Sequence, residues 1–71
     1  MKIQGKVVFQ DIEGGFWGII SDDHTQYEPV RELPKAIQVD DCRIEAEIEP
    51  ADVLSFRMWG RPVYVRSIKR V

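Results

Sequence analysis

The segment from Cys42 to Pro50 alternates strictly between two kinds of side chain, and this alternation constrains the fold more than any other feature. Apolar or small residues occupy one face and charged residues the other: Cys42, Ile44, Ala46 and Ile48 against Arg43, Glu45, Glu47 and Glu49. Successive side chains of a β-strand point to opposite faces, so a period of two predicts a strand with one buried and one solvated face. Pro50 ends it, because proline cannot donate to a β-ladder.

Four further segments are typical of short strands, each bounded by turn residues. They are residues 3–9, 16–21, 26–30 and 63–71. Gly14 and Gly15 predict the turn between the first two, because glycine adopts positive φ without steric cost. Gly5 predicts a bend or a bulge within the first strand. The alternation changes phase near Ser67, which predicts a bulge in the last strand.

The order of these elements predicts the fold class. Three strands are followed by a short helical turn over residues 35–38, which Pro34 can begin, and then by two more strands. Five short curved strands with a helical turn between the third and fourth are typical of the OB-type barrel. An SH3-like barrel is the alternative, although its helical turn usually comes later. We therefore predict an all-β, five-stranded OB-like barrel that forms a single domain, residues 1–71.

The composition limits what such a barrel can do. A chain of 71 residues buries only about 60% of its unfolded surface, which leaves little core to support a deep catalytic cleft. The formal net charge of -2 argues against a strongly electrostatic nucleic-acid binder, although it leaves room for a local basic patch. A lone cysteine, Cys42, favours a reducing cytoplasm over secretion. We therefore expect no signal peptide, and the longest apolar runs are too short to predict a membrane span.

Two family resemblances add to this prediction. The first rests on GKVVFQDIEGGFWGIISDD, YEPV, ELP and VLSFRMWGRPVYV, which occur in this order along nearly the whole chain. Together they resemble a family of short, uncharacterised prokaryotic OB-like proteins that carry a GGF-aromatic-GI hairpin and a Met-Trp-Gly motif before the last strand. The resemblance implies the barrel fold and no established activity.

The second resemblance covers only residues 5 to 23 and is to the cold-shock domain. In that family, aromatic rings on the outer face stack on single-stranded bases. The resemblance places Phe9 on the stacking tryptophan of the first strand and Phe16 on the first phenylalanine of the hairpin motif. Gly18 falls on the second phenylalanine, so that ring is missing, and Glu13 stands near a lysine of the family. The comparison thus implies the fold more than the function.

The hairpin offers the first candidate binding residues. Phe16 and Trp17 are adjacent, so they point to opposite faces. The cold-shock comparison places Ile19 on the inner face, and Trp17 shares its parity. We therefore expect Trp17 to pack inward and Phe16 to be exposed, where it would dock or stack on a ligand. The alternative is a hairpin whose rings cover one end of a small barrel.

Residues 56–62 offer the second candidate. Arg57, Trp59 and Arg61 interleave arginine with an aromatic ring, a composition typical of binding edges because arginine stacks on rings and grips phosphate. In OB folds the loop between strands four and five often borders the ligand groove. The alternative is a loop folded back onto the barrel, with arginines that only solubilise it.

The remaining polar clusters favour structural roles. Residues 40–52 are acidic and residues 57–71 basic, and opposite charges of this kind are expected to face each other across neighbouring strands. Asp22, Asp23 and His24 are consecutive, so they predict a solvated turn and no metal site. Cys42 is expected to be a buried thiol. No catalytic set or cofactor motif is apparent.

These observations predict a binding module that is not an enzyme and needs no cofactor, with an unknown protein or polymer partner. The expected ligand-binding residues are Phe16, Tyr27, Arg57, Trp59 and Arg61. The alternative is weak single-stranded nucleic-acid binding of the cold-shock type, with Phe9, Phe16, Tyr27 and Trp59 as stacking residues. A third hypothesis is an enzyme whose site forms by oligomerisation. An oligomer is possible because the edges of the third strand can pair between subunits.

Overall fold

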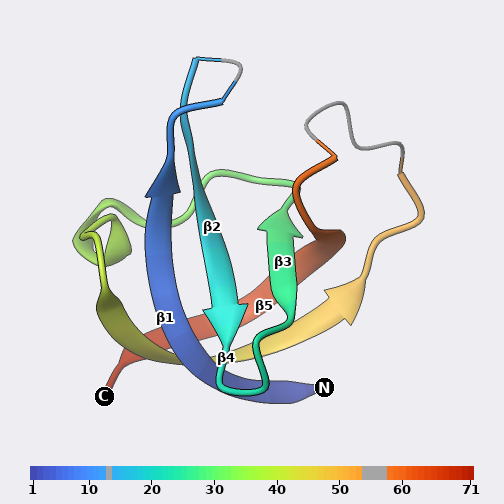
Figure 1. Cartoon of the computed structure of the whole chain (residues 1–71). Coiled ribbons are helices and arrows are strands. Elements are labelled where there is room, and N and C mark those ends of the chain that lie inside the picture. The colour runs from blue at the N-terminus through green and yellow to red at the C-terminus, as the bar shows by residue number, and fades with distance from the viewer. Residues whose placement is uncertain (13, 54–57) are drawn as a thin grey trace.

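The computed structural model describes residues 1–12, 14–53 and 58–71 and shows a closed five-stranded barrel (Figure 1). Its elements are β1 (Lys2–Gln10), β2 (Phe16–Ser21), β3 (Gln26–Pro29), the 3₁₀ turn η1 (Lys35–Ile37), β4 (Cys42–Pro50) and β5 (Arg61–Arg70). The strands follow one another around the barrel in the order β1-β2-β3-β5-β4, and β4 pairs with β1 to close it. The predicted all-β, five-stranded barrel, with its helical turn between the third and fourth strands, is confirmed.

One strand pair is parallel, and it explains how the barrel closes. β3 and β5 run in parallel, with Tyr27 opposite Arg61 and Pro29 opposite Val63, while the other four pairs are antiparallel. A parallel pair needs a long connection, and the segment that holds η1 and β4 supplies it. β5 begins at Arg61, two residues before the predicted start, because Arg61 and Pro62 pair with β3.

The core consists of the inward-facing residues of each strand, as the alternation in β4 predicted. Val7, Ile19, Ile44 and Ile48 are completely or almost completely buried. Leu33 and Ile37 join the same cluster from the connection between β3 and β4. Burying a side chain of this size stabilises the fold by about 1.5–3 kcal/mol, so these residues dominate the stability of so short a chain.

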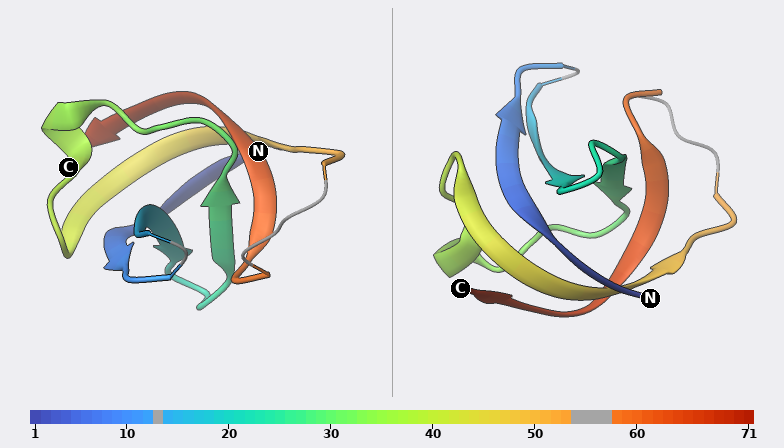
Figure 2. Two further views of the ribbon diagram at one scale, coloured as in Figure 1. Left: turned by 90° about the horizontal axis from the view of Figure 1, so that it is seen from above. Right: turned by 60° about the horizontal axis from the view of Figure 1, so that its bottom comes forward.

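Two local devices let the strands curve around this core (Figure 2). At Gly5, β1 pairs with both β2 and β4, and a Cβ there would collide with the Ile20 carbonyl oxygen and lie 2.7 Å from Ser21 Cα. Between β4 and β5 the register shifts: Glu47 lies opposite Ser67, but Ile48 lies opposite Val65. The skipped residue of β5 directly precedes Ser67, so the predicted bulge is confirmed.

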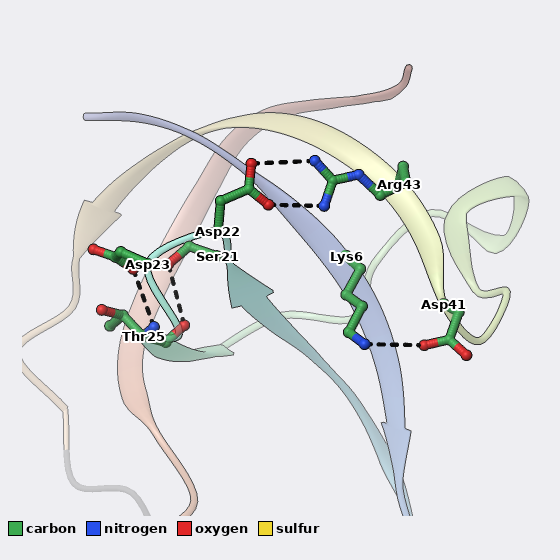
Figure 3. Close-up of polar contacts among 7 residues, drawn as sticks. All are labelled: Lys6, Ser21, Asp22, Asp23, Thr25, Asp41 and Arg43. Atoms are coloured by element: carbon green, nitrogen blue, oxygen red, sulfur yellow. Dashed lines mark hydrogen bonds and ion pairs between the residues drawn. The ribbon is translucent and has the colours of Figure 1, made fainter.

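Ion pairs join the strands across the outer surface. Lys69 pairs with Glu45 at 3.6 Å and Arg66 with Glu49 at 2.6 Å, both between β5 and β4. The expectation that the acidic and basic segments face each other is therefore confirmed. Figure 3 shows two further contacts, in which the Arg43 guanidinium grips both oxygens of Asp22 and Lys6 lies 3.4 Å from Asp41.

Candidate functional site

The β1–β2 hairpin positions the aromatic residues of the candidate site. Gly14 and Gly15 have φ values of 87° and 94°, a conformation that only glycine adopts easily, and the Gly15 N–H donates to the Ile12 carbonyl at 2.9 Å. This turn sets the register, in which Phe9 lies opposite Trp17. Directly opposite residues share a face of the sheet, so the turn brings these two rings together.

Phe9 and Trp17 form one aromatic pair, on the inner face of the hairpin. Their ring centres are 5.1 Å apart in an edge-to-face arrangement. Trp17 is half-buried and packs against the core, so the expectation that it faces inward is confirmed. Phe9, its direct cross-strand partner, keeps 46% of its surface exposed. Its ring covers Gly15, where a Cβ would lie 2.6 Å from Phe9 Cζ.

Phe16 and Trp59 form a second pair, on the outer face. Phe16 does point outward, but only 8% of its surface is exposed, so the prediction that it is an exposed ring is wrong. The reason is Trp59, whose indole lies edge-to-face with Phe16 at 5.4 Å and rests on Gly18. A Cβ at Gly18 would lie 2.6 Å from Trp59 Cη2, so the missing side chain at this position is what admits the indole.

Polar contacts with β3 hold Trp59 in this position. In the amide orientation that satisfies both groups, Gln26 donates to the Trp59 carbonyl at 3.1 Å and accepts from the indole N–H at 3.3 Å. The following Gly60 lies so close to the Gln26 carbonyl that a Cβ would come within 2.7 Å of it. Trp59 thus folds back onto the barrel, the alternative considered for this loop.

The other predicted site residues are not gathered with this pair. Tyr27 is a core residue with 7% of its surface exposed, so a ligand could reach its ring only by displacing the core. Arg61 is exposed at the start of β5, opposite Tyr27. Arg57 lies outside the described residues. The structure therefore brings Phe16 and Trp59 together and leaves Arg61 at the surface.

A groove of about 340 Å³ lies beside the inner aromatic pair. One side is formed by Phe9 and residues 15–17 of the hairpin, and the other by residues 29–33, which follow β3. Figure 1 shows this second segment leaving β3 and passing behind β2 toward η1. The groove therefore combines an exposed aromatic ring with the exposed cation of Arg31.

A larger hollow of about 750 Å³ lies on the other side of residues 31–34, against residues 64–68 of β5. Arg31 lines this hollow as well as the smaller groove, but its other arginine, Arg66, pairs with Glu49 at 2.6 Å and lies over the Tyr64 ring at 5.5 Å. None of its lining residues is an exposed aromatic ring. We therefore place the candidate site in the smaller groove.

Some charged side chains already have a partner within the protein, and others do not. Arg43 donates to Asp22 and lowers the pKa of that carboxyl, and Arg66 lowers the pKa of Glu49 in the same way. The pKa of Glu45 is also lowered, first by a hydrogen bond from Gln4 and then by the charge of Lys2. Among the described residues, Arg31 makes no ion pair, so its charge is available to a ligand.

Within residues 1–12, 14–53 and 58–71, no three His, Cys, Asp or Glu side chains come together in a group that could hold a metal ion. No helix in the same ranges is long and apolar enough to cross a membrane. The turn at Asp22–Thr25 is held by its own hydrogen bonds: Asp23 accepts from the Ser21 hydroxyl and from the Thr25 N–H.

No family model, curated protein or solved structure matches this chain. Both resemblances noted from the sequence therefore stay predictions, and the function has to be inferred from the geometry of the site.

Sequence reasoning missed two parts of the site. It did not place Trp59 on Gly18, although a glycine between large apolar residues in a strand is a known signal of close approach. It also missed residues 29–33 as one side of a groove. Pro29 signalled the end of a strand, but no local pattern identifies the segment that faces the hairpin across space.

Proposed function

We propose that this protein is a small non-enzymatic module that binds a protein or another polymer, with its site in the groove between the β1–β2 hairpin and residues 29–33. The observation that carries the proposal is the Phe9 ring. It stays 46% exposed beside Trp17, although a chain this short has few large side chains to fill its core. Ile12, which follows β1 in the hairpin loop, is also exposed. Apolar surface of this kind, rimmed by polar residues, is typical of interaction sites.

The geometry favours this function over single-stranded nucleic-acid binding. Stacking needs a row of accessible rings, but Phe16 is covered by Trp59 and Tyr27 belongs to the core. Phosphate binding needs available cations, but five basic side chains of the described residues are already ion-paired: Lys2, Lys6, Arg43, Arg66 and Lys69.

A capture experiment tests the proposal with matched variants. Immobilised wild-type protein is compared with Phe9→Ser and with Val71→Ser, which removes a still more exposed apolar side chain at the C-terminus, away from the hairpin (Figure 1). We expect Phe9→Ser to weaken binding of the captured partner by about tenfold, the equivalent of 1.4 kcal/mol, and Val71→Ser to leave it unchanged. Circular dichroism verifies that both variants are folded. Equal binding by Phe9→Ser and wild type would contradict the proposal.

A titration with a labelled single-stranded oligonucleotide pool at low salt tests the alternative. We expect no binding up to high micromolar protein. Binding that quenches tryptophan fluorescence, and whose logarithm falls linearly with the logarithm of salt concentration, would favour nucleic acid instead.

A further inference from the structure

The pairing of β2 with β3 covers the second half of β2 and does not reach its beginning. β2 spans Phe16–Ser21, but its pairs with β3 are Ile19 with Tyr27 and Ile20 with Gln26. Continuing this antiparallel register by two residues would set Trp17 opposite Pro29. Proline has no N–H and cannot complete a hydrogen-bonded pair. β3 has by then turned to β5, where the Val30 N–H donates to the Val63 carbonyl at 3.0 Å.

The main chain of Trp17 faces the side of β2 on which the pairing with β3 has stopped. In an antiparallel ladder, alternate residues direct their N–H and C=O groups to the same neighbouring strand. The Asp22 N–H donates to the Gln4 carbonyl of β1 at 2.9 Å, and the Ser21 N–H donates to the Thr25 carbonyl next to β3 at 3.0 Å. Even-numbered residues of β2 therefore face β1, and odd-numbered residues face the side of β3. Trp17 is odd-numbered, so its N–H and C=O point away from β1, toward the end of β3.

The gap left by β3 is the groove of the proposed site. Trp17 and Pro29 both line it, together with the Phe9 ring and Arg31. The other charged residue of the groove, Glu32, has its carboxylate held by the Gln38 amide at 3.3 Å, while Arg31 makes no ion pair with any described residue. The N–H and C=O of Trp17 point to this side, where Pro29 has no N–H to pair with that carbonyl, and the Phe9 ring and the cation of Arg31 line the same groove.

We propose that this groove binds an extended peptide segment, which adds as a strand to the edge of β2 at Trp17. An apolar side chain of the peptide packs against Phe9, and an acidic side chain pairs with Arg31. This inference rests on the proposed binding function and specifies the partner. Main-chain hydrogen bonds supply affinity in strand addition, and pockets for alternate side chains supply specificity. Residues 29–33 close the far side of the groove, so a single chain fits it better than the edge of a second barrel.

Peptides that alternate glutamate with valine or phenylalanine test the inference. Fluorescent octapeptides of this composition, acetylated and amidated, are titrated into the intact protein. We expect saturable binding. Methylating alternate amide nitrogens along one edge of the peptide should weaken binding by at least tenfold, and methylating the other edge should not, because only one edge faces β2. Arg31→Glu should weaken binding about tenfold, while Arg70→Glu, which reverses an exposed charge at the end of β5, should not.

Amide hydrogen exchange locates the bound peptide. We expect exchange of the Trp17 amide to slow at least tenfold when the peptide binds. Three results would overturn the inference: no binding at millimolar peptide, binding that ignores which edge is methylated, or binding that leaves the Trp17 amide unprotected. Protection of that amide by protein concentration alone would also overturn it, since the occupant would then be a second copy. If the inference fails while Phe9→Ser still loses its captured partner, the proposed function stands without strand addition.

Discussion

Replacing Gly18 by alanine tests how the Trp59 indole is seated. In an ordinary strand this change is favourable by about 0.5–1 kcal/mol, because glycine loses more backbone freedom on folding. Here the new methyl group would lie 2.6 Å from Trp59 Cη2, whereas ordinary van der Waals contacts begin at 3.4 Å. The indole must therefore move away, and with it the cover over Phe16.

The expected cost is a large part of the total stability. Overpacking of this kind costs about 1–3 kcal/mol, and a chain of this length has roughly 4–10 kcal/mol of folding free energy. Trp59→Ala should cost about 2 kcal/mol, less than the 3–5 kcal/mol of a fully buried tryptophan, because the indole is half-buried. In the Trp59→Ala background the methyl group at position 18 has room, so adding Gly18→Ala should cost nothing or stabilise slightly. The two changes should therefore deviate from additivity by about 1–3 kcal/mol.

Wild type, the two single variants and the double variant form a double-mutant cycle. Urea unfolding followed by circular dichroism measures the free energy of unfolding of each without relying on the tryptophan signal. Gly14→Ala is the matched control. Gly14 has φ 87° and nothing within 4 Å of a built Cβ, so its cost should be the same with or without Trp59. If Gly18→Ala and Trp59→Ala add to within about 0.5 kcal/mol, the indole does not rest on Gly18 and the assignment is wrong.

Two further predictions concern the barrel itself. Gly5→Ala should cost about 3 kcal/mol of stability or prevent folding. The methyl group would collide with the main chain of Ile20 and Ser21, which cannot move aside as a ring can. A thermal melt checks this, and a wild-type melting temperature would refute it. Stability should fall in acid, because the pKa values of Asp22 and Glu49 in the folded protein lie below their ordinary values of 3.8 and 4.5. Their contribution is complete above those ordinary values and is lost as the pH drops through the folded ones. Arg66→Gln should make the unfolding midpoint less sensitive to pH between 6 and 3, and an unchanged pH profile would count against the Glu49 pair.

The sequence predicted the barrel because its strongest patterns are local. The alternation from Cys42 to Pro50, the glycine pair at 14–15 and the change of phase before Ser67 each act on the chain within a few residues. The folded protein therefore shows the strand, the turn and the bulge that these patterns predicted. Even the orientation of Trp17 follows from strand parity relative to Ile19.

The site depends on contacts between distant segments, and local patterns could not show these. Parity correctly placed Phe16 on the outer face, but its burial depends on Trp59, which arrives from the connection between β4 and β5. Similarly, Pro29 indicated that a strand ends, but the groove forms because the residues after it cross to the hairpin. The exposure of Phe9 and the availability of Arg31 follow from these long-range contacts, as do their proposed roles.

Amide hydrogen exchange along β2 in the free protein tests the central claim most directly. Ile19 faces its partner Tyr27 on β3, whereas Trp17 faces a groove in which β3 no longer pairs. After correction for intrinsic rates, the Trp17 amide should exchange roughly 100-fold faster than the Ile19 amide, because a paired amide in a central strand opens only with the surrounding structure. Equal protection of the two amides would show that the ladder continues to Trp17, and the β2 edge would then have no place for a peptide.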